Sequence, residues 1–312
     1  MKNVLKKFDR LLLLTAFMVF ALTGCEENPT DIEDYEPEPM LAAYIYNGEP
    51  VTEVFLEWTD YFLGSYNYDD QVIPGADIRI YPMNADGTLD SANVITLIDD
   101  STTPGHYIAS DMGQLIEGLK SYKIVCEKPA EEIYLESFTT VPGNYDMEIL
   151  PPGATTMQPL PAPPNMLHLP NATDSLTREA PEIFLDWTPP DSNGGFVINY
   201  ICLVDTADLV PLDPDFIIGE DVVESEDKSR LAIELILAEQ EQYTISWLMF
   251  EWVGTYEISV IASCRDYFDY VNYGMTVMMG FNIDLPTNIE GGKGIFAGLN
   301  RHTFLLTLKR AE

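Results

Sequence analysis

Short segments with apolar side chains at every second position narrow the fold of this chain more than any other feature. Such alternation runs through residues 51–58 and 76–81. A strand turns successive side chains to opposite faces, whereas an amphipathic helix needs apolar spacings of three and four. Asn47-Gly48 precedes the first segment, and an Asn-Gly pair between two such runs favours a tight hairpin turn. The pattern therefore predicts an all-β protein built from hairpins.

The same pattern continues through a first predicted domain at residues 40–141. Residues 76–81 and 93–98 predict a second hairpin across a turn at 84–87, and 122–126 predicts a further strand. The order of turns and strands resembles the transthyretin-like and carboxypeptidase-regulatory-like β-sandwich modules. The motifs that carry this resemblance are Pro74-Gly75-Ala76, Pro104-Gly105-His106-Tyr107, Gly118 and Tyr122.

A proline-rich segment follows. Residues 142–180 contain eight prolines, at positions 142, 151, 152, 159, 161, 163, 164 and 170, and few residues that favour a strand. Such a composition is typical of an extended connector. We therefore interpret 142–180 as a linker between two domains.

The second predicted domain, residues 181–312, has the pattern of an immunoglobulin-like sandwich. A strand at 182–187 ending in Trp187, a Pro-Pro and Asn-Gly-Gly turn, and a strand at 196–204 resemble the start of a fibronectin type-III module. Residues 257–262 predict a closing strand. Residues 205–253 exceed what that module needs, and we expect a helix at 231–241 within this insertion. A turn at 290–294 and a final strand at 302–309 complete the expected domain.

The N-terminal 24 residues predict a removable export signal. Four basic residues within the first ten precede a twelve-residue apolar run at 11–22. A membrane-spanning helix needs about 20 apolar residues, so the run is too short to serve as a permanent anchor. We predict that residues 1–24 are a signal peptide.

The end of this signal resembles the lipobox of bacterial lipoproteins. The residues that carry the resemblance are Leu22-Thr23-Gly24-Cys25. It implies that Cys25 becomes the first residue, that its thiol carries a diacylglycerol, and that the acyl chains anchor the protein in the outer membrane. Residues 25–39 hold seven acids and no base, which predicts an extended tether. Acids directly after the cysteine also resemble the surface-export signals of Bacteroidota lipoproteins, which implies a surface-exposed location.

Charge and motif content argue against several function classes. The chain has 51 Asp and Glu against 16 Lys and Arg, a net charge of −35, which would repel nucleic acid. The three histidines, at 106, 168 and 302, lack zinc-ligand spacing, and the turns at 84–93 and 290–294 lack the ligand pattern of a calcium loop or a phosphate-binding loop. No Gly-x-Ser-x-Gly motif is present. We therefore expect no metal, no cofactor and no enzymatic activity, with a glycan-active enzyme as the less favoured alternative.

Two aromatic clusters are candidate ligand or partner contacts, because tyrosines in loops present a flat apolar face and a hydrogen-bonding tip. Packing in the core is the alternative reading for both. The clusters are Tyr61, Phe62, Tyr66 and Tyr68 in the first domain, and Tyr267, Phe268, Tyr270 and Tyr273 in the second.

Two cysteines of the second domain also leave alternatives open. Cys202 and Cys264 fall on strands expected to be neighbours, so an exported protein could link them by a disulfide. Two buried free thiols are the alternative.

Taken together, these features resemble an uncharacterised family of Bacteroidota outer-membrane lipoproteins, classed as a domain of unknown function and often encoded beside TonB-dependent receptors. The resemblance implies an accessory that helps such a receptor capture a ligand. It brings no catalytic residues. A pilus-type or adhesion lipoprotein is the alternative. The residues that carry the resemblance are Cys25, 41–58, Ile73-Pro74-Gly75-Ala76, Pro104-Gly105-His106-Tyr107 and, most specifically, 286–298.

Overall fold

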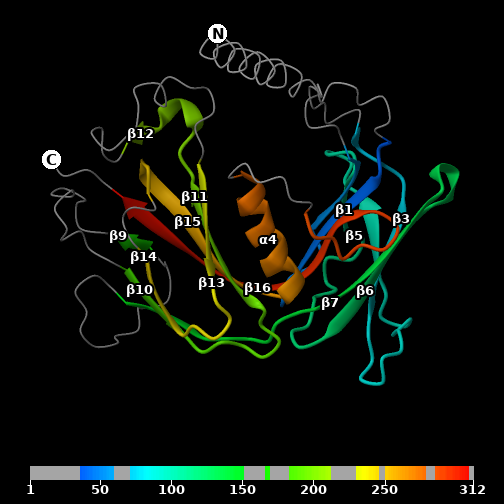
Figure 1. Cartoon of the computed structure of the whole chain (residues 1–312), viewed down its shortest axis with the longest axis horizontal. Helices are drawn as coiled ribbons and strands as arrows, with labels where there is room; N and C mark the ends of the chain where they lie inside the picture. The colour runs from blue at the N-terminus through cyan, green and yellow to red at the C-terminus, as the bar shows by residue number, and fades with distance from the viewer. Residues whose placement is uncertain are drawn as a thin grey trace, which may run out of the picture. The chain divides into compact units, whose positions relative to one another are not determined.

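Strands dominate the computed structural model, as the alternating pattern predicts (Figure 1). The structure describes residues 36–59, 71–150, 166–168, 183–211, 230–245, 250–278 and 285–308. The chain divides into the units Met1–Pro37 and Glu38–Glu312, and the architecture below is that of the second unit. Within the described residues, no helix is long and apolar enough to cross a membrane.

The N-terminal half of this unit forms a sandwich of hairpins. β1 and β2 pair across the Asn47-Gly48 turn, where Gly48 has a φ of 76°, and β3 pairs with β4, so both predicted hairpins are confirmed. β6 covers the strand predicted at 122–126. The elements are β1 Pro39–Tyr46, β2 Glu53–Trp58, β3 Asp77–Pro82, β4 Ile95–Asp99, β5 His106–Ala109, β6 Ser121–Lys128, the 3-10 turn η1 Pro129–Glu131 and β7 Ile133–Thr140.

The C-terminal half forms a second sandwich around Trp187, which is buried as predicted. A small sheet in the order β14-β10-β8 packs against β11, β15 and β16. The elements are β8 Met147–Leu150, β9 Met166–His168, β10 Ile183–Trp187, β11 Gly195–Cys202, the 3-10 turn η2 Thr206–Asp208, β12 Val210–Pro211, β13 Leu231–Ile236, β14 Gln242–Ile245, β15 Trp252–Ser263, α4 Arg265–Met278 and β16 Lys293–Leu308.

One strand belongs to both sandwiches. β16 begins at Lys293, earlier than the expected 302–309. Its first half pairs in parallel with β1, from Met40↔Lys293 to Tyr46↔Leu299, and its second half pairs antiparallel with β15. A single sheet therefore runs in the order β13-β11-β15-β16-β1-β2-β5-β4-β3-β6-β7 through both halves. The segments predicted as separate domains at 40–141 and 181–312 share this sheet.

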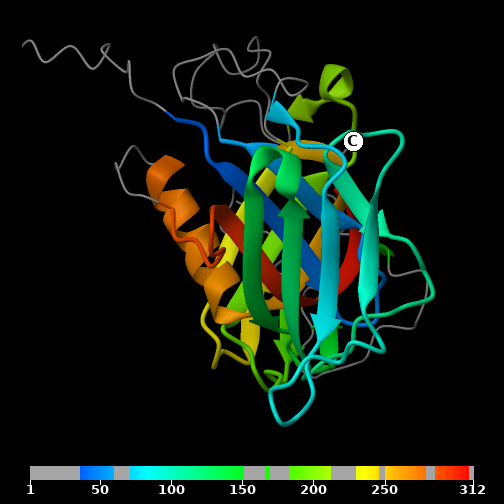
Figure 2. The same cartoon turned by 90° about the vertical axis from the view of Figure 1, so that its right-hand side faces the viewer.

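Each sandwich has its own apolar core. In the N-terminal core, residues of β1, β2, β4 and β5 face residues of β3, β6 and β7, which lie side by side in Figure 2. Ile289 and Phe296, from the C-terminal part of the chain, complete this core. A third cluster lies on the opposite face of the shared sheet and is covered by α4.

Two local predictions differ from the structure. The helix expected at 231–241 is wrong, because 231–236 is strand β13, paired antiparallel with β11. Within the expected connector at 142–180, β8 pairs with β10 and β9 pairs with β16. In both places, pairing with a distant strand decides the local structure, as is common for strands.

Candidate functional site

The C-terminal aromatic cluster lies on helix α4 and not in a loop as predicted. Phe268 is buried, Tyr267 and Tyr270 are half-buried, and Tyr273 is 41% exposed. The spacing of Tyr267, Tyr270 and Val271, at three and four residues, places these side chains on the helix face that meets the sheet. Both alternatives for this cluster are thus represented: Phe268 is core, while Tyr273 faces solvent.

The close approach of α4 to the sheet depends on Gly195 of β11. A Cβ atom at this position would lie 2.2 Å from Cδ2 of Phe268, so a larger residue would push the helix away. At the first turn of α4, the Arg265 guanidinium lies 5.6 Å from the Phe268 ring centroid and pairs with Asp269 at 2.8 Å. Both Arg265 contacts lie within α4 and stabilise its first turn, while Phe268 packs against Gly195 of the sheet.

Two tyrosines of β1 face α4. Leu41, Ala43 and Ile45 point into the N-terminal core, so the alternating positions Tyr44 and Tyr46 lie on the opposite face. The Tyr44 and Tyr267 rings meet edge to face, with centroids 5.8 Å apart. The sequence analysis did not identify either tyrosine as a candidate contact. The alternation at 41–46 does predict that both lie on the face opposite Leu41, Ala43 and Ile45.

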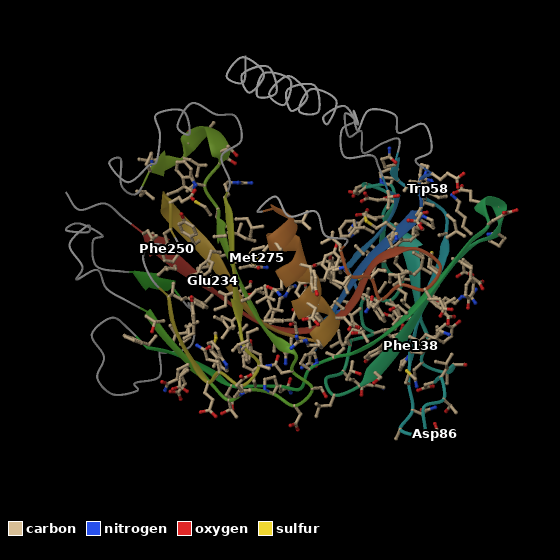
Figure 3. The ribbon with its side chains drawn as sticks, in the orientation of Figure 1. Trp58, Asp86, Phe138, Glu234, Phe250 and Met275 are labelled. Carbon is tan, nitrogen blue, oxygen red and sulfur yellow. The ribbon has the colours of Figure 1, made fainter. Side chains whose placement is uncertain are left out.

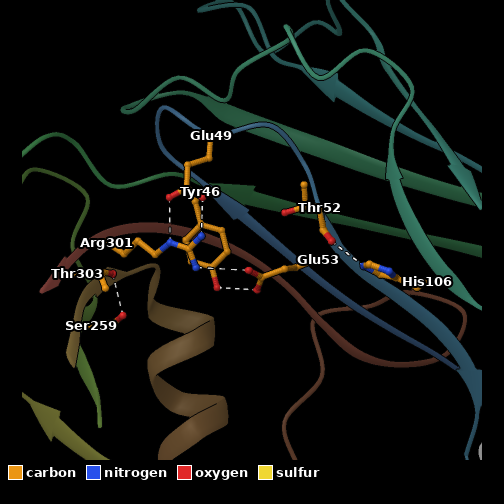
Figure 4. Close-up of polar contacts among 8 residues, drawn as sticks. All are labelled: Tyr46, Glu49, Thr52, Glu53, His106, Ser259, Arg301 and Thr303. Carbon is orange, nitrogen blue, oxygen red and sulfur yellow. Dashed lines mark hydrogen bonds and ion pairs between the residues drawn. The ribbon is translucent and has the colours of Figure 1, made fainter. Parts of the chain in front are cut away.

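Arg301 of β16 is the polar centre of this surface (Figure 4). Its guanidinium lies 4.0 Å from the Tyr46 ring centroid and binds Glu49 through two hydrogen bonds of 2.9 and 2.6 Å. A longer contact of 3.4 Å reaches Glu53, which also accepts a 2.9 Å hydrogen bond from the Tyr46 hydroxyl. Two-point binding orients a guanidinium firmly. We call Tyr44, Tyr46, Glu49, Glu53, Tyr267, Tyr270, Tyr273 and Arg301 the α4 surface.

Polar side chains continue from Arg301 across the sheet. Thr303 and Ser259, on the paired strands β16 and β15, share a 2.9 Å hydrogen bond. Asn199 of β11 is the next residue in this row. Its amide oxygen is buried and has no hydrogen-bond partner among the described residues. The face beside α4 therefore presents hydrogen-bonding groups next to aromatic ones.

The tyrosines of this surface are held in their neutral form. Burial, followed by the neighbouring Glu53 and Tyr267, raises the pKa of Tyr46, and burial also raises the pKa of Tyr44. Burial raises the pKa of Tyr267 to about 12, with a smaller contribution from Glu53. Neutral hydroxyls both donate and accept hydrogen bonds, which suits recognition.

We expect the protein to lose stability between about pH 10 and pH 12. An unfolded tyrosine ionises near pH 10, whereas the pKa of folded Tyr267 is about 12. A raised folded pKa contributes stability that is complete below pH 10 and disappears as the pH rises to 12. Titration of tyrosinate absorbance alongside circular dichroism measures this. Tyr267→Phe should shift the loss to higher pH, and an unchanged profile in that variant would contradict the assignment.

Cys202 and Cys264 are both buried free thiols. They lie on neighbouring strands, as predicted, but at opposite ends: Cys202 pairs with Tyr256, whereas Cys264 follows Ser263, the partner of Gly195. The eight residues of β11 separate them by roughly 23 Å, and a disulfide needs Cα atoms within about 7 Å. The structure therefore contradicts a disulfide between Cys202 and Cys264 and agrees with the alternative of two buried free thiols.

Thiol chemistry tests this arrangement. We expect Cys126, Cys202 and Cys264 to react with a thiol reagent only after unfolding, because all three are buried and burial raises the pKa of Cys126 to about 12. Native and denatured protein are compared by reagent absorbance. A peptide map of unreduced protein that contained a Cys202–Cys264 crosslink would refute the prediction.

The remaining predicted site residues lie outside the described residues. These are Cys25 and the first aromatic cluster, Tyr61, Phe62, Tyr66 and Tyr68. Their predicted roles stay predictions.

No cluster of metal-ligating side chains occurs in the part of the chain that the structure describes. There, no three His, Cys, Asp or Glu side chains come together in a way that could hold a metal ion. The two carboxylates of the α4 surface, Glu49 and Glu53, are both engaged by Arg301.

Comparison with known proteins gives no family. No family model and no curated protein matches the chain. A segment of two fibronectin type-III domains from chicken tenascin aligns with 87% of this chain and 99% of its own, at 11% sequence identity and a TM-score of 0.21. The FN1–FN3 domains of chicken CNTN1 align with 87% of this chain and 67% of their own, at 10% identity and a TM-score of 0.17. The all-β class thus rests on the strands themselves.

Proposed function

We propose that this protein is a lipid-anchored binding protein of the bacterial outer membrane that associates with a TonB-dependent receptor through the α4 surface and helps it capture a ligand. The observation that carries the proposal is the convergence of Tyr44, Tyr267 and Arg301 from distant parts of the chain onto one partly exposed face. Tyrosine and arginine dominate the energetic centres of protein interfaces.

The location is supported by the sequence. The lipobox resemblance at Cys25 and the acidic segment 25–39 place a lipid and a spacer ahead of β1. The resemblance to receptor-associated lipoproteins at 286–298 supports the choice of partner.

Binding fits the α4 surface better than catalysis. A general base needs a carboxylate or imidazole that is available to a substrate proton. Here Arg301 engages both Glu49 and Glu53, and the neighbouring tyrosines have raised pKa values through burial. An arginine held by carboxylates beside aromatic rings is instead a preorganised contact group.

Substitutions on α4 test the partner role. We expect Tyr273→Ala and Tyr270→Ala together to weaken receptor co-purification in mild detergent at least about tenfold, as loss of an interface centre does. Tyr134→Ala is the control, because Tyr134 is an exposed tyrosine on β7 of the other sandwich. Equal recovery of the receptor with all variants would overturn the proposed interface.

Anchoring is tested separately. We expect Cys25→Ala to leave the protein without lipid label and to release it from the membrane fraction, since the acyl chains supply the membrane affinity. Cys126→Ala, which removes a core thiol, should keep the label. Membrane retention and labelling of the Cys25→Ala protein would overturn the anchor.

A further inference from the structure

A groove lies between strands β6 and β7 and the start of α4, and none of its lining residues belongs to the α4 surface. Its volume is about 440 Å³, within the range of small-molecule sites. One wall carries Phe138 and Thr140 of β7 and Ser121 of β6, and the other carries Ser192, Arg265 and Asp266. Figure 3 shows Phe138 on the N-terminal sandwich, so each half of the molecule supplies one wall.

The two walls are held at a fixed separation. The Gly298 amide of β16 donates to the Thr139 hydroxyl at 2.8 Å, while the Gly298 carbonyl accepts from the Cys264 amide at 2.9 Å. The Gly143 amide also donates to the Asp191 carbonyl at 3.0 Å. The groove is therefore preformed, which reduces the entropy cost of binding.

The lining combines an aromatic surface with neutral hydrogen-bonding groups. The Phe138 residue is 49% exposed, which is unusual for a phenylalanine on a sheet that has a complete core. Beside it, the Ser121 and Thr140 hydroxyls lie 2.8 Å apart. Across the groove, Asp266 accepts from Asn288 at 3.0 Å, and Arg265 binds Asp269 through two of its five N–H groups.

The charges around the groove favour a neutral ligand. Arg265 is paired with Asp269, and the nearby Lys123, whose ammonium lies 5.0 Å from the Phe138 ring centroid, is paired with Glu136 at 2.8 Å, so neither basic group is free to pair with an anion. The net charge of −35 also opposes an anion, and Arg265 beside Asp266 leaves no net negative charge on that wall to attract a cation. The Ser121–Thr140 hydrogen bond uses only one donor of the two hydroxyls, and a purely apolar ligand would leave their remaining hydrogen-bonding capacity unused.

The strand edge beside the groove argues against an extended peptide. A peptide that extends the sheet needs free backbone groups on β7. Glu136 already exchanges both backbone hydrogen bonds with Glu290, at 3.1 and 2.8 Å, and the Thr139 hydroxyl binds Gly298. The backbone of Glu136 on this edge is therefore not available to pair with a peptide strand.

We propose that this groove binds a neutral saccharide, with a pyranose face against Phe138 and hydroxyls bonded to Ser121, Thr140, Arg265 and Asp266. A pyranose ring has apolar C–H faces and a rim of hydroxyls that donate and accept hydrogen bonds. These two properties match the aromatic and hydroxyl-bearing walls. The inference does not depend on the receptor partnership, because it concerns the isolated protein.

The test uses purified Cys25→Ala protein without any receptor. Maltohexaose, cellohexaose, xylohexaose and mannohexaose are titrated by calorimetry and by saturation-transfer NMR. We expect at least one to bind with a Kd below about 1 mM. Phe138→Ala should weaken that binding at least tenfold, whereas Tyr134→Ala, an exposed aromatic on the same strand outside the groove, should leave it unchanged.

Three outcomes would overturn the proposal. The first is that none of the four oligosaccharides binds. The second is an equal loss of affinity with Phe138→Ala and Tyr134→Ala. The third is tighter binding of an anionic probe, hexagalacturonate, than of every neutral sugar. Circular dichroism of each variant confirms folding, which is expected because both side chains are exposed.

Discussion

Gly294→Ala should destabilise the protein by about 2–6 kcal/mol, a large part of the stability of an ordinary domain. Gly294 has a φ of 110°, a conformation that costs alanine about 1–3 kcal/mol. A Cβ atom there would also lie 2.1 Å from the Leu41 carbonyl oxygen on β1, so the two parallel strands must separate. Overpacking of this kind costs about another 1–3 kcal/mol.

Gly48→Ala is the matched control, because Gly48 has a φ of 76° but nothing within 4 Å of a Cβ atom. It should cost only about 1 kcal/mol, the conformational part alone. Urea denaturation of the parent and both variants gives the comparison. If both substitutions reduce the free energy of unfolding equally, close contact between β1 and β16 is not what requires Gly294.

A fragment of residues 40–141 should fail to fold by itself, although the sequence predicts a separate domain there. The fragment lacks Ile289 and Phe296, which complete its core and each contribute about 1.5–3 kcal/mol by burial. It also lacks the first half of β16, so β1 loses its parallel partner. The combined loss approaches the whole stability of a small domain.

Adding the missing segment back tests whether its absence is the reason that the fragment does not fold. Residues 285–300 joined after 143 by a short Gly-Ser linker should restore the β circular dichroism signal and dispersed NMR spectra. In the intact protein this segment lies beside β7, because the Ser137 hydroxyl donates to the Asn288 carbonyl and a Cβ at Gly298 would touch Thr140. The same fusion with Phe296→Ala should remain unfolded. A folded, cooperative 40–141 fragment would show that the shared strand is dispensable.

Local pattern predicts the hairpins but not the shared strand. The β1–β2 and β3–β4 turns lie between their own strands, so alternation and turn residues suffice. The partner of β16 lies some 250 positions away in the chain, and strand pattern does not specify a distant partner. The sequence does contain one sign of close strand packing, the repeated glycines at 291–298. A Cβ atom at Gly294 or Gly298 would collide with the backbone of a neighbouring strand.

Two segments have a different secondary structure from the one predicted. The segment 231–241 contains apolar residues at helical spacing, yet 231–236 pairs with β11 as an outer strand. At 265–278, closely spaced aromatics predict a loop, yet the structure has helix α4. There, Tyr267, Tyr270 and Val271 bury one helix face against the sheet.

The candidate site was predicted only in part. The clustering of Tyr267, Tyr270 and Tyr273 in the sequence predicts them as candidate ligand or partner contacts. Arg301 carried no local signal, because its partners Glu49 and Glu53 come from the opposite end of the chain. Only the parallel pairing of β1 with β16 brings these charges together.

The shared strand also determines how the molecule responds to tension. β1 and β16 point the same way, with the N-terminal end of β1 beside Lys293 and the far end of β16 in the other sandwich. Suppose that a force is applied to the residues before β1 while the C-terminal sandwich is held in place. Such a force would shear β1 along β16. The backbone hydrogen bonds of the seven register pairs would then be loaded together and not unzipped one by one. The junction is therefore built to resist shear, which suits a protein held at one end while its other half is engaged.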